Sequence, residues 1–189
     1  MARRPSKGKK LKKGILIYSE GQTERIYFEA LNRRFNASNI KVKPISIERQ
    51  SKALVTKALK RIKKNEDSKN LNIEQAISLA NKSKLGIKGQ LKIGFSNESF
   101  EVWLLSHFEN VLKYHSLTRK QTYQKLTTYL NVTDYEKLKA DENLGNLFVE
   151  LVKSAINIGI HFNQLPCQEM MQAPYTNLGW IVEEIYFQK

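Results

Sequence analysis

The chain has 189 residues, 41% of them hydrophobic, and a formal net charge of +14. This length fits one domain whose core removes about two thirds of the unfolded chain's surface from water. No apolar run reaches the roughly 18 residues of a membrane span, and no apolar segment follows the basic N-terminus as in a secretory signal. The single cysteine, Cys167, excludes an intramolecular disulfide and a cysteine metal cluster. We therefore expect no membrane partner and a reducing, cytoplasmic setting.

The positive charge is concentrated in two segments. Residues 1–13 carry seven basic and no acidic side chains, and we expect a disordered arm there. The basic side chains of this arm are Arg3, Arg4, Lys7, Lys9, Lys10, Lys12 and Lys13. A second basic set follows i, i+3, i+4, i+7 spacing on a predicted helix, at Lys57, Lys60, Arg61 and Lys64. Such surfaces predict binding to nucleic acid, either DNA or RNA, and a merely solubilising charge is the alternative.

Strands and helices alternate through the first half of the chain. Hydrophobic periodicity predicts a buried strand over residues 15–18, a helix over 23–35, a strand kinked at Pro44 over 40–47, helices over 51–64 and 73–82, and a strand over 91–95. A helix is then expected over residues 99–112. Its core stripe consists of Phe100, Trp103, Leu104, His107, Phe108 and Val111.

After residue 113 the sequence predicts helices and no convincing strand. The three helices are expected over residues 117–130, 144–158 and 177–187. The element order predicts an α/β fold class, with a small, mainly parallel sheet flanked by helices and an α-helical C-terminal part. We divide the chain into the arm 1–13, an α/β domain 14–112 and a helical part 113–189 packed on that domain.

Glu20 is the first candidate for chemistry. It follows the strand predicted over residues 15–18 and precedes Gly21, which permits a sharp turn into the next helix. Because functional groups gather at the carboxyl ends of strands in open α/β sheets, Glu20 is a candidate metal ligand or proton acceptor. Glu24 lies in the first helical turn, where a carboxylate stabilises the helix by itself, and we assign it that structural role.

A second group of polar residues follows the strand predicted over residues 91–95. If the two strand ends are adjacent, Glu20 comes within reach of Glu98 or Glu101. Carboxylate oxygens suit Mg²⁺, which in turn can hold a phosphate. His107 lies within the apolar stripe of the following helix, where a hydrogen-bonded core histidine is the structural alternative to a general acid or base.

Three segments resemble those of a known family. They read ILIYSEGQTERIYF over residues 15–28, GFSNESFEVWLLSHF over 94–108 and APYTNL over 173–178. Their content and order are similar to those of RloB-like proteins. The resemblance implies a Toprim-like domain, the metal-dependent catalytic module of topoisomerases, primases and some nucleases. It also implies a role in prokaryotic antiviral defence or restriction loci, often beside an ATPase. By this resemblance Glu20 is the Toprim glutamate, a general base or metal ligand, and Glu101 and His107 fall on the second motif.

One departure from the family pattern concerns the metal site. The resemblance implies a strand that ends in an Asp-x-Asp pair, whose aspartates would be the main magnesium ligands. Residues 63–72 read KKNEDSKNLN, with neither an apolar strand nor that pair. Either the site is lost, or the metal is held by Glu20, Glu98 and Glu101. The missing strand also leaves sheet edges that a helix, a partner or a second copy of the chain must cover.

Two functions remain open on these grounds. The first is a metal-dependent nuclease or related phosphodiester-acting component of a prokaryotic defence system, of the abortive-infection or restriction-associated kind. The second is a catalytically impaired nucleic-acid-binding or regulatory protein that acts with a partner ATPase. A purely structural partner of an ATPase is a weaker third alternative.

Overall fold

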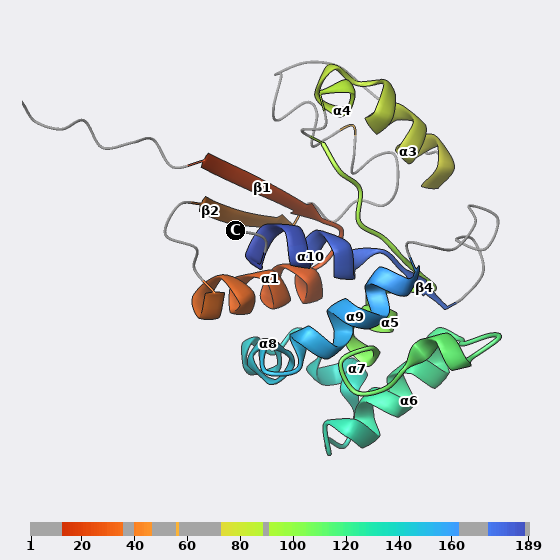
Figure 1. Ribbon diagram of the computed structural model, residues 1–189. Helices are drawn as coiled ribbons and strands as arrows, with labels where there is room; N and C mark the ends of the chain where they lie inside the picture. The colour runs from red at the N-terminus through yellow and green to blue at the C-terminus, as the bar shows by residue number, and fades with distance from the viewer. Residues whose placement is uncertain are drawn as a thin grey trace, which may run out of the picture.

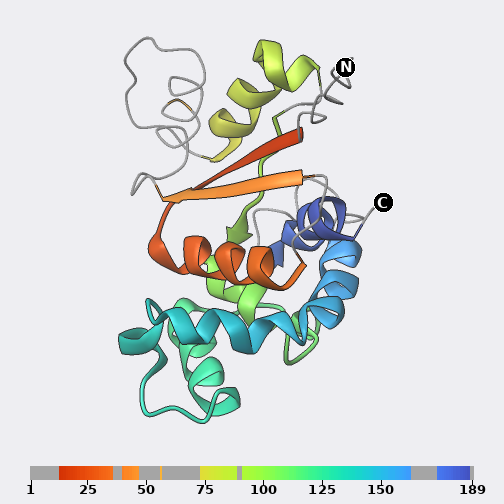
Figure 2. The same ribbon diagram turned by 90° about the vertical axis from the view of Figure 1, so that its left-hand side faces the viewer.

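A computed structural model describes residues 13–35, 40–46, 56, 73–88, 91–162 and 174–187. Strand β1 (Lys13–Ser19) pairs in parallel with β2 (Ile40–Ser46), in a register that sets Lys13 opposite Ile40. Helix α1 (Gln22–Phe35) connects the two strands. In two perpendicular views α1 lies on one side of the strand pair, and α3 (Ile73–Lys82) lies on the other (Figures 1 and 2).

The predicted Toprim-like α/β sheet is wrong. Within the described ranges no sheet has more than two strands, and most of the ordered elements are helices. The second sheet is an antiparallel pair of two-residue strands, β3 (Ser96–Asn97) and β4 (Tyr175–Thr176). β4 lies in the half of the chain for which only helices were predicted. Residues 91–95, predicted to be a strand, have no regular secondary structure.

A side chain explains why residues 91–95 do not join a sheet. The N–H of Phe95 donates to Oδ1 of Asn177 at 2.8 Å, and Nδ2 of Asn177 donates to the carbonyl of Ile93 at 3.0 Å. The amide group of Asn177 therefore makes the two hydrogen bonds that a neighbouring strand would otherwise make. Ser96 continues this contact through its hydroxyl, 2.8 Å from Oγ1 of Thr176.

Strand β1 is more exposed than the sequence predicts. Leu16 is 51% exposed, and Ile15 and Ile17 are only partly buried. A pair of strands covers less of each member than a wide sheet does, so the apolar run 15–18 does not become a fully buried strand.

Two helices of the first half agree with the predicted positions. Helix α1 begins one residue before the predicted start, and α3 has the predicted bounds. A short helix that was not predicted, α4 (Lys84–Ile87), follows α3, and the Ser83 hydroxyl caps it by accepting from the Gly86 N–H at 2.9 Å. The helix predicted over residues 51–64 lies outside the described residues, except for Thr56.

Helix α5 (Phe100–Leu105) is shorter than predicted because two side chains compete for a backbone carbonyl. The Ser106 hydroxyl donates to the Trp103 carbonyl at 2.6 Å, and Nδ1 of His107 donates to the same oxygen at 3.0 Å. The backbone N–H of His107 instead bonds the Leu104 carbonyl, one residue closer than in an α-helix. A 3-10 turn, η1 (Val111–Lys113), follows.

Five further helices form the C-terminal part. They are α6 (Arg119–Tyr129), α7 (Tyr135–Leu138), α8 (Glu142–Val149), α9 (Val152–Phe162) and α10 (Leu178–Tyr186). The helix predicted over residues 144–158 is divided between α8 and α9. This break lets α8 pack on α1 and α9 pack on α10 (Figure 1). The described helices include none with the length and hydropathy of a membrane span.

One hydrophobic core joins both halves of the chain. Its buried members include Tyr27 of α1, Trp103 of α5, Leu126 of α6, Phe148 of α8 and Val182 of α10. Helices α9 and α10 cross at two glycines, since a Cβ on Gly159 would lie 2.6 Å from the Cα of Gly179. This core spans the boundary proposed at residue 112, and the division into 14–112 and 113–189 stays a prediction.

Candidate functional site

Three carboxylates from two distant segments gather where β1 ends. Glu20 follows β1, Glu24 lies in the first turn of α1, and Glu101 lies in the first turn of α5. Glu101 is only 6% exposed. Burial raises the pKa of Glu24, and the nearby charges of Glu101 and Glu20 raise it further. The fold therefore places Glu20 and Glu101 close enough to Glu24 for their charges to act on it.

The backbone turn at Gly21 holds Glu24 in place. Hydrogen bonds with the backbone of Glu24 and Gly21 lower the pKa of the Glu24 carboxyl and so offset part of the effect of burial. Oε2 of Glu24 lies 3.0 Å from the position that a Cβ on residue 21 would take. Glycine therefore leaves the space that the carboxylate needs when it folds back over the helix N-terminus.

Helices α6 and α7 add the phenol groups of Tyr123 and Tyr135 beside Glu101. The Tyr135 hydroxyl donates to Oε1 of Glu101 at 3.5 Å, and Tyr135 is fully buried. The ring of Tyr123 meets the ring of Tyr135 edge-on, with 5.4 Å between centroids. Lys139 donates to the Tyr123 hydroxyl at 3.3 Å. Burial raises the pKa of Tyr135, and the Glu101 charge adds to this, so its phenol remains a hydrogen-bond donor at neutral pH.

Two cations border the carboxylates. Lys139 and Arg119 both act on Tyr123, where their charges lower a phenol pKa that burial and Glu101 raise. The Arg119 guanidinium also donates to the backbone carbonyl of Glu98 at 3.4 Å. The ion pairs found among the described residues include neither cation and neither Glu24 nor Glu101. Opposite charges therefore lie near one another here without direct pairing.

The other predicted site residues lie in different environments. Glu98 and Glu20 are exposed. The backbone carbonyl of Glu98 accepts a hydrogen bond from Arg119. The structure thus brings Glu20 and Glu101 close enough to affect the pKa of Glu24. Among the described groups, Glu98 is not one of the charges that act on this pKa. Lys13 is the first residue of β1. The remaining predicted nucleic-acid-binding residues lie outside the described residues: Arg3, Arg4, Lys9, Lys10, Lys12, Lys57, Lys60, Arg61 and Lys64.

His107 lies in the aromatic core. Its Nε2 is 3.1 Å from the Tyr27 hydroxyl, and its ring contacts Trp103 and Phe148 edge-on. Because the Trp103 carbonyl can only accept, Nδ1 carries the proton and Nε2 accepts from Tyr27. Burial lowers the pKa of His107 to about 3, so the ring is neutral. This is the environment of a structural histidine, and a catalytic role for it stays a prediction.

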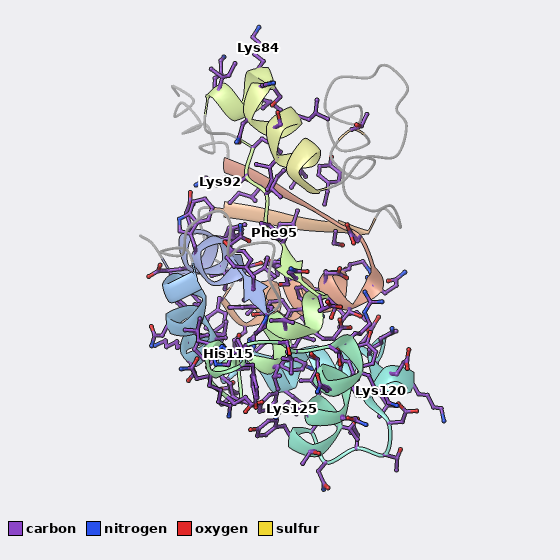
Figure 3. All side chains as sticks on the ribbon, turned by 90° about the vertical axis from the view of Figure 1, so that its right-hand side faces the viewer. Lys84, Lys92, Phe95, His115, Lys120 and Lys125 are labelled. Atoms are coloured by element: carbon purple, nitrogen blue, oxygen red, sulfur yellow. The ribbon has the colours of Figure 1, made fainter. Side chains whose placement is uncertain are left out.

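Positive charge is spread over the described surface. Lys84 lies on α4 at one end of the molecule, whereas Lys120 and Lys125 lie on α6 at the other (Figure 3). Lys92 packs over the ring of Trp180 at 4.6 Å and pairs with Glu184, so part of this charge is already neutralised. The described surface alone therefore does not form a single basic face.

Sequence reasoning missed several members of the site. Glu24 is the third residue of α1, a position from which a carboxylate reaches back to the helix N-terminus, and this signal was available. No sequence signal pointed to Tyr135 and Lys139, because α7 was not predicted and no motif marks it. Arg119 was recognisable only as the start of a helix.

The described carboxylates do not form a three-ligand metal site. In the ranges that the structure describes, no three side chains of His, Cys, Asp or Glu are arranged to hold one metal ion. Mg²⁺ does not require such a cage, since it is usually bound through one or two carboxylates, with water and substrate phosphates at its other positions. Glu24 and Glu101 would hold it, with Glu20 at the exposed side.

A family model provides the deciding comparison. The model described as RloB-like protein matches residues 15–185, which is most of the chain. The chain belongs to the RloB-like protein family. Comparisons with curated proteins and with solved structures give no significant match. In this RloB-like protein the segment 15–28 supplies Glu20 and Glu24, the segment 94–108 supplies Glu101, and Asn177 of the third segment fastens the second in place.

Proposed function

We propose that this RloB-like protein cleaves phosphodiester bonds of nucleic acid with the help of a divalent cation. The observation that carries the proposal is that the charge of the buried Glu101 raises the pKa of Glu24, which is partly buried near the end of β1. Burying like charges together is unfavourable unless a cation or protons compensate for it. A divalent cation would provide that compensation, and the net charge of +14 favours a polyanionic substrate.

Each residue of the site has a distinct part in this chemistry. Glu24 and Glu101 would hold Mg²⁺, which when bound activates water and neutralises phosphate charge. Tyr135 orients Glu101 through its hydrogen bond. The pKa of Glu24 is raised in the metal-free protein partly because like charges lie near it, and a bound cation would compensate for those charges. Glu20 stays in contact with solvent and adds negative charge beside the cation.

The biological setting is proposed from the family. RloB-like proteins are expected in prokaryotic defence or restriction loci, often beside an ATPase, and family membership supports the same setting for this chain. A nuclease that a partner restrains until infection fits a defence role. The partner ATPase, association with a second copy and the choice between DNA and RNA are parts of this proposal that need separate tests.

The test is cleavage with variants of the two carboxylates. Labelled single-stranded DNA, duplex DNA and single-stranded RNA are incubated with the protein and Mg²⁺ or Mn²⁺. We expect cleavage of at least one substrate, lost by at least a hundredfold in Glu24→Gln and in Glu101→Gln, since each removes a charged ligand. Glu29→Gln is the matched control, because Glu29 lies on α1 but pairs with Arg25 at 2.8 Å. Melting curves establish that all variants are folded.

Binding without catalysis is the second candidate function. The absence of a three-ligand group among the described residues and the core position of His107 favour it. If no metal supports cleavage and both carboxylate variants behave as the parent does, the protein is a nucleic-acid-binding or regulatory component. Removal of residues 1–12 should then weaken binding and reduce its salt dependence, because the arm carries much of the charge.

A further inference from the structure

We propose that Arg119 and Lys139 form a phosphate-binding site for the nucleic-acid backbone, beside the carboxylates of Glu24 and Glu101. The inference rests on the proposed function for its substrate class, and it assigns the anion-binding half of the site to α6 and the end of α7. Neither residue belongs to the three segments that resemble the family.

Arg119 is held at the edge of the acidic group by its own helix. It is the first residue of α6, after a capping box in which Thr118 and Gln121 exchange hydrogen bonds. Its guanidinium donates one hydrogen bond to the Glu98 carbonyl at 3.4 Å, just before α5 begins. A guanidinium has five N–H donors, so this bond, the one found for Arg119 among the described residues, leaves donors for a ligand.

Lys139 contacts Tyr123 directly. It follows the last residue of α7, and its ammonium donates to the Tyr123 hydroxyl at 3.3 Å. The Lys139 side chain is partly buried and lines a small cavity with Tyr135 and Thr23. Tyr135 in turn donates to Glu101, so a chain of side-chain contacts runs from Lys139 to the carboxylate.

Several lysines near these two cations are paired with carboxylates, although Lys120, like Arg119 and Lys139, takes part in no described ion pair. Lys137 lies 3.5 Å from Asp134, and Lys113 and Lys125 share the carboxylate of Glu109. Arg119 and Lys139 take part in none of the described ion pairs. The carboxylate of Glu101 is nonetheless near, because the charges of all three residues affect the pKa of Tyr123.

A ligand that carries both signs of charge explains this arrangement. A metal-bound phosphodiester presents a cation to Glu24 and Glu101 and anionic oxygens to Arg119 and Lys139. Guanidinium and ammonium groups are the usual phosphate partners, and charge-assisted hydrogen bonds are stronger than neutral ones. The class of ligand assigned to these cations is therefore the phosphodiester backbone, without base recognition.

Neighbouring lysines provide matched controls for the test. Arg119→Gln is compared with Lys120→Gln on the next residue of α6, and Lys139→Gln with Lys137→Gln on α7. The side chain of Lys137 is 82% exposed and paired with Asp134, and Lys120 is exposed. Within each pair the variants lose the same charge from the full chain, so long-range attraction changes equally. Circular dichroism and melting temperature confirm the fold of all four.

Binding is measured by fluorescence anisotropy in EDTA, so that no divalent-dependent cleavage occurs. The probes are a labelled 12-nucleotide single-stranded DNA and an RNA of the same sequence. We expect Arg119→Gln and Lys139→Gln each to weaken binding about five- to tenfold more than the matched control, for both probes. The slope of log affinity against log salt should fall by about 0.7 for each lost phosphate contact.

The outcomes separate this inference from the proposed function. Either variant binding as tightly as its control overturns the two-cation site, even if Glu24→Gln and Glu101→Gln abolish cleavage. A loss confined to the DNA or to the RNA probe also overturns it, because phosphate is common to both. Weaker binding of both probes in both variants supports the site, whether or not the protein cleaves them.

Discussion

The hydroxyl of Tyr135 donates to Oε1 of Glu101 at 3.5 Å, and both residues are almost completely buried. This contact joins α7 to the first turn of α5. It leaves the carboxylate in the core with a phenol rather than a cation as its described hydrogen-bond partner. Glu101 therefore depends on Tyr135 for its orientation, and Tyr135 depends on the packing of α7 against α6.

Replacement of Tyr135 by phenylalanine tests this dependence. Tyr135→Phe keeps the ring and removes the donor, so we expect a loss of about 1 kcal/mol in the free energy of unfolding, measured by urea denaturation. Tyr129→Phe is the control, because the Tyr129 side chain is 45% exposed and its hydroxyl can bond water. Equal stability of the two variants would show that the Tyr135 hydroxyl does not stabilise Glu101.

The crossing of α9 and α10 gives a second prediction. A Cβ on Gly179 would lie 2.7 Å from the Cα of Gly159 and 2.9 Å from the Ile156 carbonyl, and backbone atoms cannot move aside cheaply. Gly179→Ala should therefore destabilise the protein by about 1–3 kcal/mol, although alanine has the higher helix propensity. Thermal melting measures this, with Asn157→Ala on the exposed face of α9 as control. A rise in melting temperature for Gly179→Ala would contradict the close crossing.

Asn177 supports a third prediction. Its side chain makes two hydrogen bonds to the backbone at Ile93 and Phe95, and Asn177→Ala removes both at once. We expect a loss of about 2–3 kcal/mol, since each net hydrogen bond contributes about 1 kcal/mol and the buried backbone groups lose their partners. Amide exchange at Phe95 should quicken more than the exchange within α6. Unchanged protection of Phe95 in the variant would mean that another group satisfies its N–H.

These cases show how far the sequence predicts the fold. Helices α1 and α3 follow from hydrophobic periodicity, because one apolar face is enough to position them. The strand expected over residues 91–95 is absent, and the hydrogen-bond partner of Ile93 and Phe95 is Asn177, far along the chain, through both its side chain and its backbone N–H. The end of α5 depends on side-chain bonds of Ser106 and His107, which a periodic pattern cannot reveal.

The candidate site was predictable in part for similar reasons. Glu20 and Glu101 stand out because they occupy the ends of apolar segments, and both influence Glu24 in the fold. Glu24 itself was assigned to helix stabilisation, a role that its position also satisfies. Tyr135 meets Glu101 only through the packing of short C-terminal helices, and no local pattern encodes such a contact. The catalytic and metal-binding roles themselves stay predictions until activity is measured.

His107 gives a prediction about pH. The core holds this ring neutral and lowers its pKa from 6.5 to about 3, so the unfolded chain binds a proton more readily than the folded chain. Its stabilising effect is complete above about pH 6.5 and is lost as the pH falls toward 3. As the pH falls from about 6.5 to about 3, the free energy of unfolding should decrease in both proteins. The decrease should be larger by a few kcal/mol in the parent than in His107→Gln.

Urea denaturation at a series of pH values measures this difference. His115→Gln is the control, because it removes an exposed histidine instead of the buried one. Carboxylates also titrate in this pH range. Their contribution to the free energy of unfolding is the same in the parent and in both variants, so it cancels when the curves are compared. Parallel stability curves for the parent and His107→Gln would show that His107 is accessible to protons in the folded state.

The contact between Phe95 and Asn177 also bears on how the chain reaches its fold during synthesis. The two residues are 82 positions apart, and Tyr175, Leu178 and Val182 of the same C-terminal segment fill the core. A nascent chain emerges from its N-terminus, so the centre of the molecule lacks these partners until residues 175–182 have been synthesised. Contacts of such long sequence separation form slowly, since a long loop must close first. The ribosome-bound chain therefore exposes an incomplete core until those residues emerge.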